Sequence, residues 1–215
     1  MKIYDNVPQH LENGDANPDW LALRAGKFSA SDFNQYMPIV KKGELSDTAE
    51  SNLYKKALES VGYDFDGGRV TDAMARGTEL EPFARAEYMA TTFEDVQEVA
   101  FVDWEQLRAG CSPDGVIYAP DGSIKKIVEI KCPEIKNYLK MAQGKIPPLY
   151  QCQVQFQLLV TGAESCDFVV WHPDMRLIIT EIKPDADFQK DIVTALEKLN
   201  ARYDEILNEI EQYKK

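Results

Sequence analysis

Long apolar runs, repeats and clustered cysteines are missing from this 215-residue sequence. No run approaches the ~18 consecutive apolar residues of a membrane-spanning helix, and the opening residues MKIYDNVPQH lack the apolar stretch of a signal peptide. There are also no low-complexity tracts or linker-like Pro/Gly/Ser runs. We therefore expect a soluble, cytoplasmic protein with no membrane partner, folded as one domain over residues 1–215.

Potential ligands for a soft metal are few and dispersed. The four cysteines are widely spaced: Cys111, Cys132, Cys152 and Cys166. None forms a C-x-x-C pair, which favours reduced thiols packed as small apolar residues on buried strands. His10 and His172 have no ligand partner at helical or strand spacing, and Trp171 is interpreted as a core residue rather than a base-stacking platform.

Basic residues are outnumbered by acidic ones, 24 to 36, which gives a net charge of −12. Proteins that bind nucleic acid usually display a basic patch, so this excess argues against long-range attraction to a polyanion. It does not exclude DNA, because carboxylates that hold cations make a metal site acidic until it is loaded. A few local arginines and lysines can also meet phosphates.

Hydrophobic periodicity divides the chain into helices and strands. Residues 1–17 are polar and rich in turn residues, and are expected to form an N-terminal arm. Helices are then predicted over 18–24, 30–37, 48–61 and 72–91. Asp47 and Glu50 indicate a capping box at the third of these, and Gly77 and Pro82 are possible interruptions of the fourth.

The second half begins with strands and returns to helix. Strands are predicted over 94–104, 107–112, 114–119 and 124–131, with a hairpin turn at Pro120 to Ser123. Two helices, two strands and a long amphipathic helix follow, over 135–143, 148–162, 166–172, 176–182 and 185–215. This order indicates an α+β fold with a mixed central sheet flanked by helices.

The segment from Cys111 to Pro133, CSPDGVIYAPDGSIKKIVEIKCP, carries the strongest chemical signal. Glu129 and Lys131 lie two apart on one predicted strand, so their side chains share a face, and a hairpin would bring Asp114 close to them. Phosphodiester hydrolysis requires hard oxygen ligands for a divalent cation. We expect Asp114, Glu129 and the Ile130 carbonyl to hold that cation. Lys131 would orient or deprotonate water, or stabilise the transition state.

The simpler alternative is an exposed ion pair, because Glu-x-Lys on a strand usually marks the solvated face. The Ser-Pro-Asp-Gly turn upstream of the pair favours the catalytic interpretation. Pro113-Asp114 followed by Glu129-Ile130-Lys131 resembles the PD-(D/E)XK nuclease signature. Longer matches are WLALRAGKFSASDF at 20–33, RGTELEPFAR at 76–85, GCSPDGVI at 110–117, VEIKCP at 128–133 and YQCQVQFQLLVTG at 150–162.

Together these segments resemble the phage lambda exonuclease family, also called the YqaJ viral recombinase family, over residues 18–182. The resemblance implies a restriction-endonuclease-like core and a magnesium-dependent, processive 5′-to-3′ exonuclease acting on linear double-stranded DNA, with Mn²⁺ as a substitute ion. It also implies a ring-shaped homotrimer in the cytoplasm of a bacterial host. There it would pass the remaining DNA strand to a single-strand annealing protein in phage-type recombination.

Residue roles carried over from the resemblance extend the site. Asp114 and Glu129 would be metal ligands, Lys131 the catalytic lysine, and Glu81 a helix-borne carboxylate serving a second cation, in a two-metal mechanism. Glu79 is the alternative to Glu81, although it lies about 200 degrees away around a helix. Gln153 would support the lysine and the attacking water.

A second group of residues matches positions that bind a terminal 5′ phosphate: Arg24, Ser31 and Ser112, with Lys136 as the candidate for a further basic residue. Taken without the resemblance, Arg24 is equally well a surface charge beside Trp20. Glutamines 151, 153, 155 and 157 alternate along a helix, so at most two can face the site and most are expected at the surface.

Two other functions are compatible with the same residues. The fold also serves structure-specific and sequence-specific DNA endonucleases, which would cut covalently closed circles. A noncatalytic domain that binds DNA or a recombination partner would be indifferent to metal. The three charges at Asp114, Glu129 and Lys131 argue against a noncatalytic function, because burying them without a cation would be costly.

Overall fold

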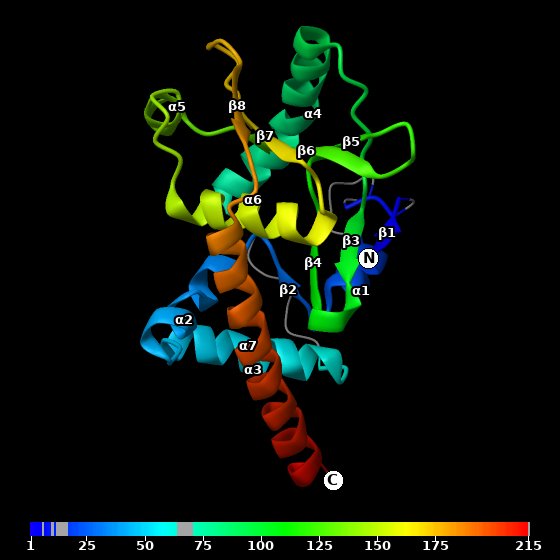
Figure 1. Ribbon diagram of the computed structural model, residues 1–215, viewed down its shortest axis with the longest axis vertical. Helices are drawn as coiled ribbons and strands as arrows, with labels where there is room; N and C mark the ends of the chain where they lie inside the picture. Colours follow the sequence, from blue (N-terminus) through cyan, green and yellow to red (C-terminus); the bar gives the residue numbers. More distant parts are fainter. Residues whose placement is uncertain (6, 10, 12–16, 64–70, 215) are drawn as a thin grey trace.

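The computed structural model describes residues 1–5, 7–9, 11, 17–63 and 71–214, and shows two four-stranded sheets surrounded by helices (Figure 1). His10 and much of the predicted arm over 1–17 lie outside the described residues. The strands of the first sheet are β1 (Lys2–Tyr4), β2 (Phe28–Ser29), β3 (Phe101–Trp104) and β4 (Ala109–Cys111). Their spatial order is β1-β3-β4-β2, in which only β2 and β4 pair in parallel.

The second sheet carries the strand with the Glu-x-Lys pair. It consists of β5 (Gly115–Tyr118), β6 (Ile124–Lys131), β7 (Ser165–Val170) and β8 (Ile178–Ile182), in that spatial order. β5 and β6 form the predicted antiparallel hairpin, whereas β6 and β7 are parallel. At Gly115 a Cβ atom would lie 2.3 Å from Val96 Cγ1, so only glycine fits between Asp114 and the rest of β5.

Helices cover both faces of the second sheet. On one face, α6 (Pro148–Thr161) packs through Val154, Phe156 and Leu158 into the larger apolar core, and the ribbon shows it crossing β6 and β7 (Figure 1). On the other face, α4 (Asp72–Thr92) contributes Ala84 and Tyr88 to a smaller core. The two faces of β6 therefore look toward different helices, as expected for alternating side chains.

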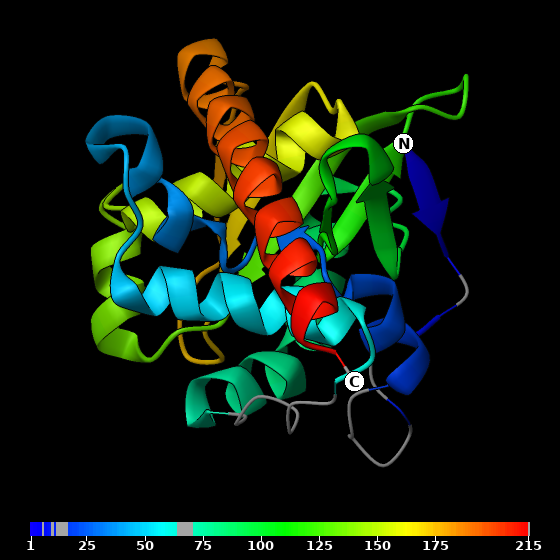
Figure 2. The same cartoon turned by 90° about the horizontal axis from the view of Figure 1, so that it is seen from below.

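The remaining helices surround these layers: α1 (Pro18–Arg24), α2 (Pro38–Lys42), α3 (Asp47–Ser60), α5 (Ile135–Met141), α7 (Ala186–Tyr213) and the 3₁₀ segments η1 (Phe33–Tyr36) and η2 (Glu105–Leu107). The long α7 lies across α3, and its C-terminal end projects away from the sheets (Figures 1 and 2). No helix in the described ranges is long and apolar enough to cross a membrane.

The α+β class and the mixed pairing of strands flanked by helices are confirmed, but several element boundaries are wrong. The predicted strand over 94–104 begins only at Phe101, and the predicted helix over 30–37 is replaced by η1 and α2. The N-cap of α3 is Ser46 rather than Asp47, since the Ser46 hydroxyl accepts from Ala49 N at 3.2 Å. Neither Gly77 nor Pro82 interrupts α4.

Candidate active site

Glu129 is the centre of a buried hydrogen-bond cluster. Its side chain is only 1% exposed. One carboxylate oxygen accepts from Lys131 Nζ and from Gln153 Nε2 at 2.6 Å, and the other accepts from Gln157 Nε2 at 2.7 Å. The alternative of a solvated Glu-x-Lys ion pair is therefore wrong for this strand.

Asp114 reaches the same cluster from the turn that precedes β5. Its Oδ2 accepts from the backbone N–H of Ile130 at 2.6 Å, between Glu129 and Lys131. The expected approach of Asp114 to the Glu-x-Lys strand is confirmed. The approach follows from the antiparallel pairing of β5 with β6, in which Gly115 lies opposite Val128.

Glu81 extends toward these carboxylates from α4. It pairs with Arg85 one turn later on the helix, and Arg85 Nε donates to the backbone carbonyl of Asp114 at 3.0 Å. Of the two candidate carboxylates on α4, Glu81 is the half-buried one and Glu79 is exposed. The geometry therefore favours Glu81.

Burial and the crowding of negative charge raise the pKa values of Asp114 and Glu81. Burial, followed by the charges of Glu129 and Glu81, raises the pKa of Asp114 well above its ordinary value. Burial also raises the pKa of Glu81, with Arg85 opposing the shift and Glu129 adding to it. Such mutual destabilisation of carboxylates is what a bound cation would relieve.

The pKa of Lys131 is raised, whereas the pKa of an isolated buried amine would be lowered. Burial acts to lower its pKa, but the charges of Glu129 and Asp114 outweigh that effect and leave the pKa raised. The ammonium form is therefore dominant around Glu129 in this arrangement. That form donates hydrogen bonds and stabilises the buried Glu129 carboxylate.

A cavity of about 160 Å³ joins this carboxylate cluster to the predicted phosphate-binding residues. Its lining includes seven predicted site residues: Arg24, Ser31, Ser112, Asp114, Glu129, Lys131 and Gln153. The parallel pairing of β2 with β4 explains part of this convergence, because it places residue 29 opposite residue 110. Ser112 directly follows β4, and Ser31 lies two residues after the end of β2.

Arg24 is held in the cavity wall by an aromatic ring rather than by a carboxylate. Its guanidinium stacks on Trp20 at 4.4 Å, and Trp20 Nε1 in turn donates to Ala100 O at 3.0 Å. Within the described ranges no ion pair of Arg24 is found, and burial lowers its pKa. An unpaired, desolvated guanidinium beside serine hydroxyls is suited to an anionic ligand.

The family of the chain follows from comparison with known proteins. Residues 19–164 match the family described as YqaJ-like viral recombinase domain. The chain belongs to this family. Membership confirms the resemblance drawn from the sequence. No curated protein sequence matches the chain.

Solved structures place the fold of this YqaJ-like chain among exonucleases. LHK-Exo in complex with dAMP is 28% identical, with a TM-score of 0.76 over 90% of this chain and 96% of that one. The alkaline exonuclease LHK-Exo from Laribacter hongkongensis gives 28% identity and a TM-score of 0.72, covering 91% and 99%. A phage related exonuclease from Haemophilus somnus 129PT, at 21% identity, TM-score 0.63 and coverage of 86% and 96%, shares the fold.

The residues of this YqaJ-like site fit a hard divalent cation by donor chemistry. Three carboxylates and an adjacent backbone carbonyl are the ligands such a cation prefers. Gln157 Oε1, also in the cavity wall, is buried without a partner among the described residues, which leaves a further oxygen acceptor there. As the side chains stand, no three acidic, histidine or cysteine groups in the described part of the chain are gathered closely enough to hold a metal.

Four features of the site differ from the sequence analysis or were absent from it. Lys136 is exposed on α5 and does not line the cavity. The glutamines of α6 are mostly buried rather than at the surface, since Gln153, Gln155 and Gln157 are 8%, 6% and 1% exposed. Gln157 was missed, although its spacing of four from Gln153 places both on one helix face. Arg85 was also missed.

Proposed function

We propose that this protein is a magnesium-dependent exonuclease that degrades one strand of linear double-stranded DNA from its 5′ end. The observation that carries the proposal is the single cavity lined both by Asp114, Glu129 and Lys131 and by Arg24 and Ser112. A hydrolytic cluster and an anion pocket in one cavity suit a DNA strand that ends there. The exonuclease descriptions of the similar structures support the same activity.

The carboxylates of Asp114, Glu129 and Glu81, with the Ile130 carbonyl, would hold two Mg²⁺ ions, with Mn²⁺ as a substitute. When bound, the metal would neutralise charge on the phosphoryl oxygens and lower the pKa of the attacking water. Gln153 keeps the Glu129 carboxylate in one orientation through its 2.6 Å hydrogen bond. Lys131 would orient or deprotonate the attacking water, or stabilise the pentavalent transition state.

The anion pocket would make cleavage dependent on a strand end. Arg24 provides a guanidinium fork and Ser31 and Ser112 provide hydroxyls for a terminal 5′ phosphate. Holding that phosphate fixes which phosphodiester lies beside Asp114 and Glu129, and so converts a general hydrolase into an exonuclease. Because the chain carries a net charge of −12, we expect DNA binding to depend on Mg²⁺ and on local basic groups.

The biological setting in this proposal comes from the resemblance. A homotrimeric, processive enzyme would act in the cytoplasm of a bacterium that carries a phage or prophage. It would hand the remaining strand to a single-strand annealing protein for recombination. Size-exclusion chromatography with light scattering tests the trimer, since a monomer at working concentration would contradict it.

Time-resolved release of nucleotides from linear duplexes tests the activity. The duplexes are labelled at either the 5′ or the 3′ end, and each is assayed with Mg²⁺ and with EDTA. We expect the 5′ label to appear first as mononucleotide, only with Mg²⁺. Equally rapid cutting of covalently closed circles would indicate an endonuclease instead, and metal-independent binding without cleavage would indicate a noncatalytic domain.

A further inference from the structure

Arg85 joins three separate segments around the carboxylate cluster. It lies on α4 and its side chain is 12% exposed. Its guanidinium pairs with Glu81 on the same helix, donates from Nε to Asp114 O at 3.0 Å and contacts Glu98 Oε1 at 2.8 Å. One rigid fork therefore links the α4 carboxylate to the backbone of the residue that opens β5.

These contacts of Arg85 set the position of Glu81 relative to Asp114, two residues that lie on different secondary-structure elements. Glu81 moves with α4, whereas Asp114 moves with the β5–β6 hairpin and is held by Ile130 N at 2.6 Å. Apart from the contacts of the Arg85 guanidinium, no hydrogen bond or ion pair among the described residues ties Glu81 to the hairpin. A planar guanidinium can hold such an arrangement because its donors have fixed directions.

We infer that Arg85 is a positioning residue that keeps the Glu81 carboxylate beside the Asp114 turn, from where a divalent cation can draw the ligands together. The inference rests on the proposed function for the identity of the ligands, and it adds a residue that contacts neither the DNA nor the metal. Partners that orient metal ligands typically change metal affinity about 10-fold to 100-fold when they are removed.

Isothermal titration of Mn²⁺ alone into the full-length protein tests this inference without any DNA. We expect Arg85→Gln to weaken Mn²⁺ binding about tenfold or more, and Arg85→Lys to weaken it less, because a lysine keeps the charge but loses the fork. Arg85→Lys also serves if Arg85→Gln does not fold. Wild-type Mn²⁺ affinity in both variants would overturn the inference.

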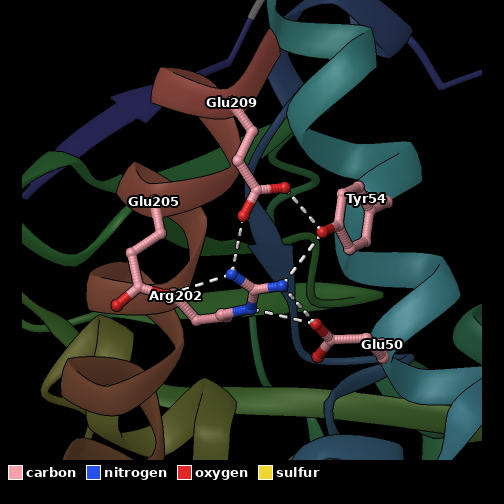
Figure 3. A network of polar contacts seen from close by, with 5 residues as sticks. All are labelled: Glu50, Tyr54, Arg202, Glu205 and Glu209. Atoms are coloured by element: carbon pink, nitrogen blue, oxygen red, sulfur yellow. Dashed lines mark hydrogen bonds and ion pairs between the residues drawn. The ribbon is translucent and has the colours of Figure 1, made fainter.

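Two control variants separate positioning from loss of charge or of stability. Glu98 is the outer partner of Arg85, and the Glu98 side chain is 72% exposed. Glu98→Gln should therefore change Mn²⁺ affinity by less than about twofold. Arg202→Gln breaks another arginine network with several carboxylates (Figure 3), whose residues do not line the cavity. Mn²⁺ binding weakened equally in either control would contradict a specific role for Arg85.

A double substitution tests whether Arg85 acts through Glu81. If it does, Glu81→Gln combined with Arg85→Gln should lose less Mn²⁺ affinity than the product of the two single losses. Multiplicative losses would overturn the inference. Because these titrations contain no DNA, they remain informative if the wild-type protein proves to have no nuclease activity.

Kinetics provide a second readout that a DNA-binding role for Arg85 would not share. For a positioning residue, Arg85→Lys should raise the Mg²⁺ concentration needed for half-maximal activity, while saturating Mg²⁺ restores kcat and leaves KM for DNA unchanged. A raised KM for DNA at saturating Mg²⁺ would instead mean that Arg85 contacts the substrate, contrary to the inference.

Discussion

Gln157 donates its side-chain amide to Glu129 at 2.7 Å, one helical turn beyond Gln153, which donates to the other carboxylate oxygen. Both glutamines project from the buried face of α6. The pair encloses a carboxylate that otherwise accepts a side-chain hydrogen bond only from Lys131 among the described residues. The amide of Gln157 is thus part of what makes a buried Glu129 tolerable.

Replacing this amide by a carboxylate should therefore be costly. In Gln157→Glu, a second buried charge faces Glu129 without a partner, and we expect metal-free protein at pH 8 to lose at least about 3 kcal/mol of unfolding free energy. Urea denaturation measures it. Gln151→Glu, at an exposed position of the same helix, should be nearly neutral. Similar stabilities for the two variants would contradict the role of Gln157.

Lys131 should matter for turnover and, as the one cation that pairs with buried Glu129 among the described residues, also for stability. Its ammonium lies against Glu129 in the cavity, so Lys131→Ala removes a group expected to act in the transition state. Turnover should fall at least about 100-fold, with the Kd for DNA nearly unchanged. Single-turnover cleavage and fluorescence anisotropy measure the two quantities. A variant with full activity would refute the assigned role.

The cluster around Asp114 could be predicted because its determinants are local. Alternation along β6 and the turn before β5 place Asp114 beside the Glu129 strand once the hairpin forms, and hairpins form between neighbours in sequence. Which residues line the cavity, however, depends on α1, β2, β4 and α6 meeting around that hairpin. The resemblance supplied Arg24, Ser31 and Glu81, whereas spacing alone did not.

What was missed depends on contacts between distant segments. β1 pairs with β3 across nearly half of the chain, with Lys2 opposite Asp103, so no local pattern marks it as a strand. The start of α3 was misplaced by one residue because Ser46 and Asp47 are both good N-cap residues. Arg85 resembles any helix-surface arginine until Asp114 is placed next to it.

Asp114 provides a test based on pH. Its folded-state pKa is raised, so its favourable contribution to stability is full below the unfolded value of about 3.8 and is lost as pH rises through the folded pKa. Asp114→Asn never ionises, and its oxygen can still accept from Ile130 N. Without metal, its stability relative to wild type should therefore rise between pH 4 and pH 8.

Urea denaturation of both proteins across that range measures the difference. Adding Mg²⁺ should stabilise the wild type at pH 8 and have a smaller effect on Asp114→Asn, because the amide is a weaker ligand for a hard cation. A pH-independent difference between the two proteins would show that Asp114 is not shifted in the folded state.

Arg24 should determine the preference for phosphorylated ends. With Arg24→Gln we expect the ratio of kcat/KM for 5′-phosphate over 5′-hydroxyl duplexes to fall about tenfold or more, the scale of a hydrogen bond to a charged group. Lys136→Gln is the matched control, since Lys136 lies outside the cavity. If only Lys136→Gln lost the preference for 5′-phosphate ends, Lys136 rather than Arg24 would be the residue that binds the terminal phosphate.

Arg202 links α7 to α3 through an exposed network (Figure 3). It bonds to Glu50 at 2.9 Å and to Tyr54 at 2.9 Å across the helix interface, and to Glu205 and Glu209 along α7. Because its side chain is 31% exposed, solvent screens these pairs, and Arg202→Gln should lower the unfolding free energy by only about 1 kcal/mol.

Salt distinguishes charge from packing in this loss. The difference between wild type and Arg202→Gln in urea should shrink toward zero at 1 M NaCl, where the Debye length is about 3 Å. Lys183 pairs with Glu181, and their side chains are 62% and 49% exposed, respectively. Lys183→Gln should therefore leave the unfolding free energy unchanged. An undiminished loss for Arg202→Gln at high salt would mean that the side chain stabilises the α3–α7 contact through its apolar stem.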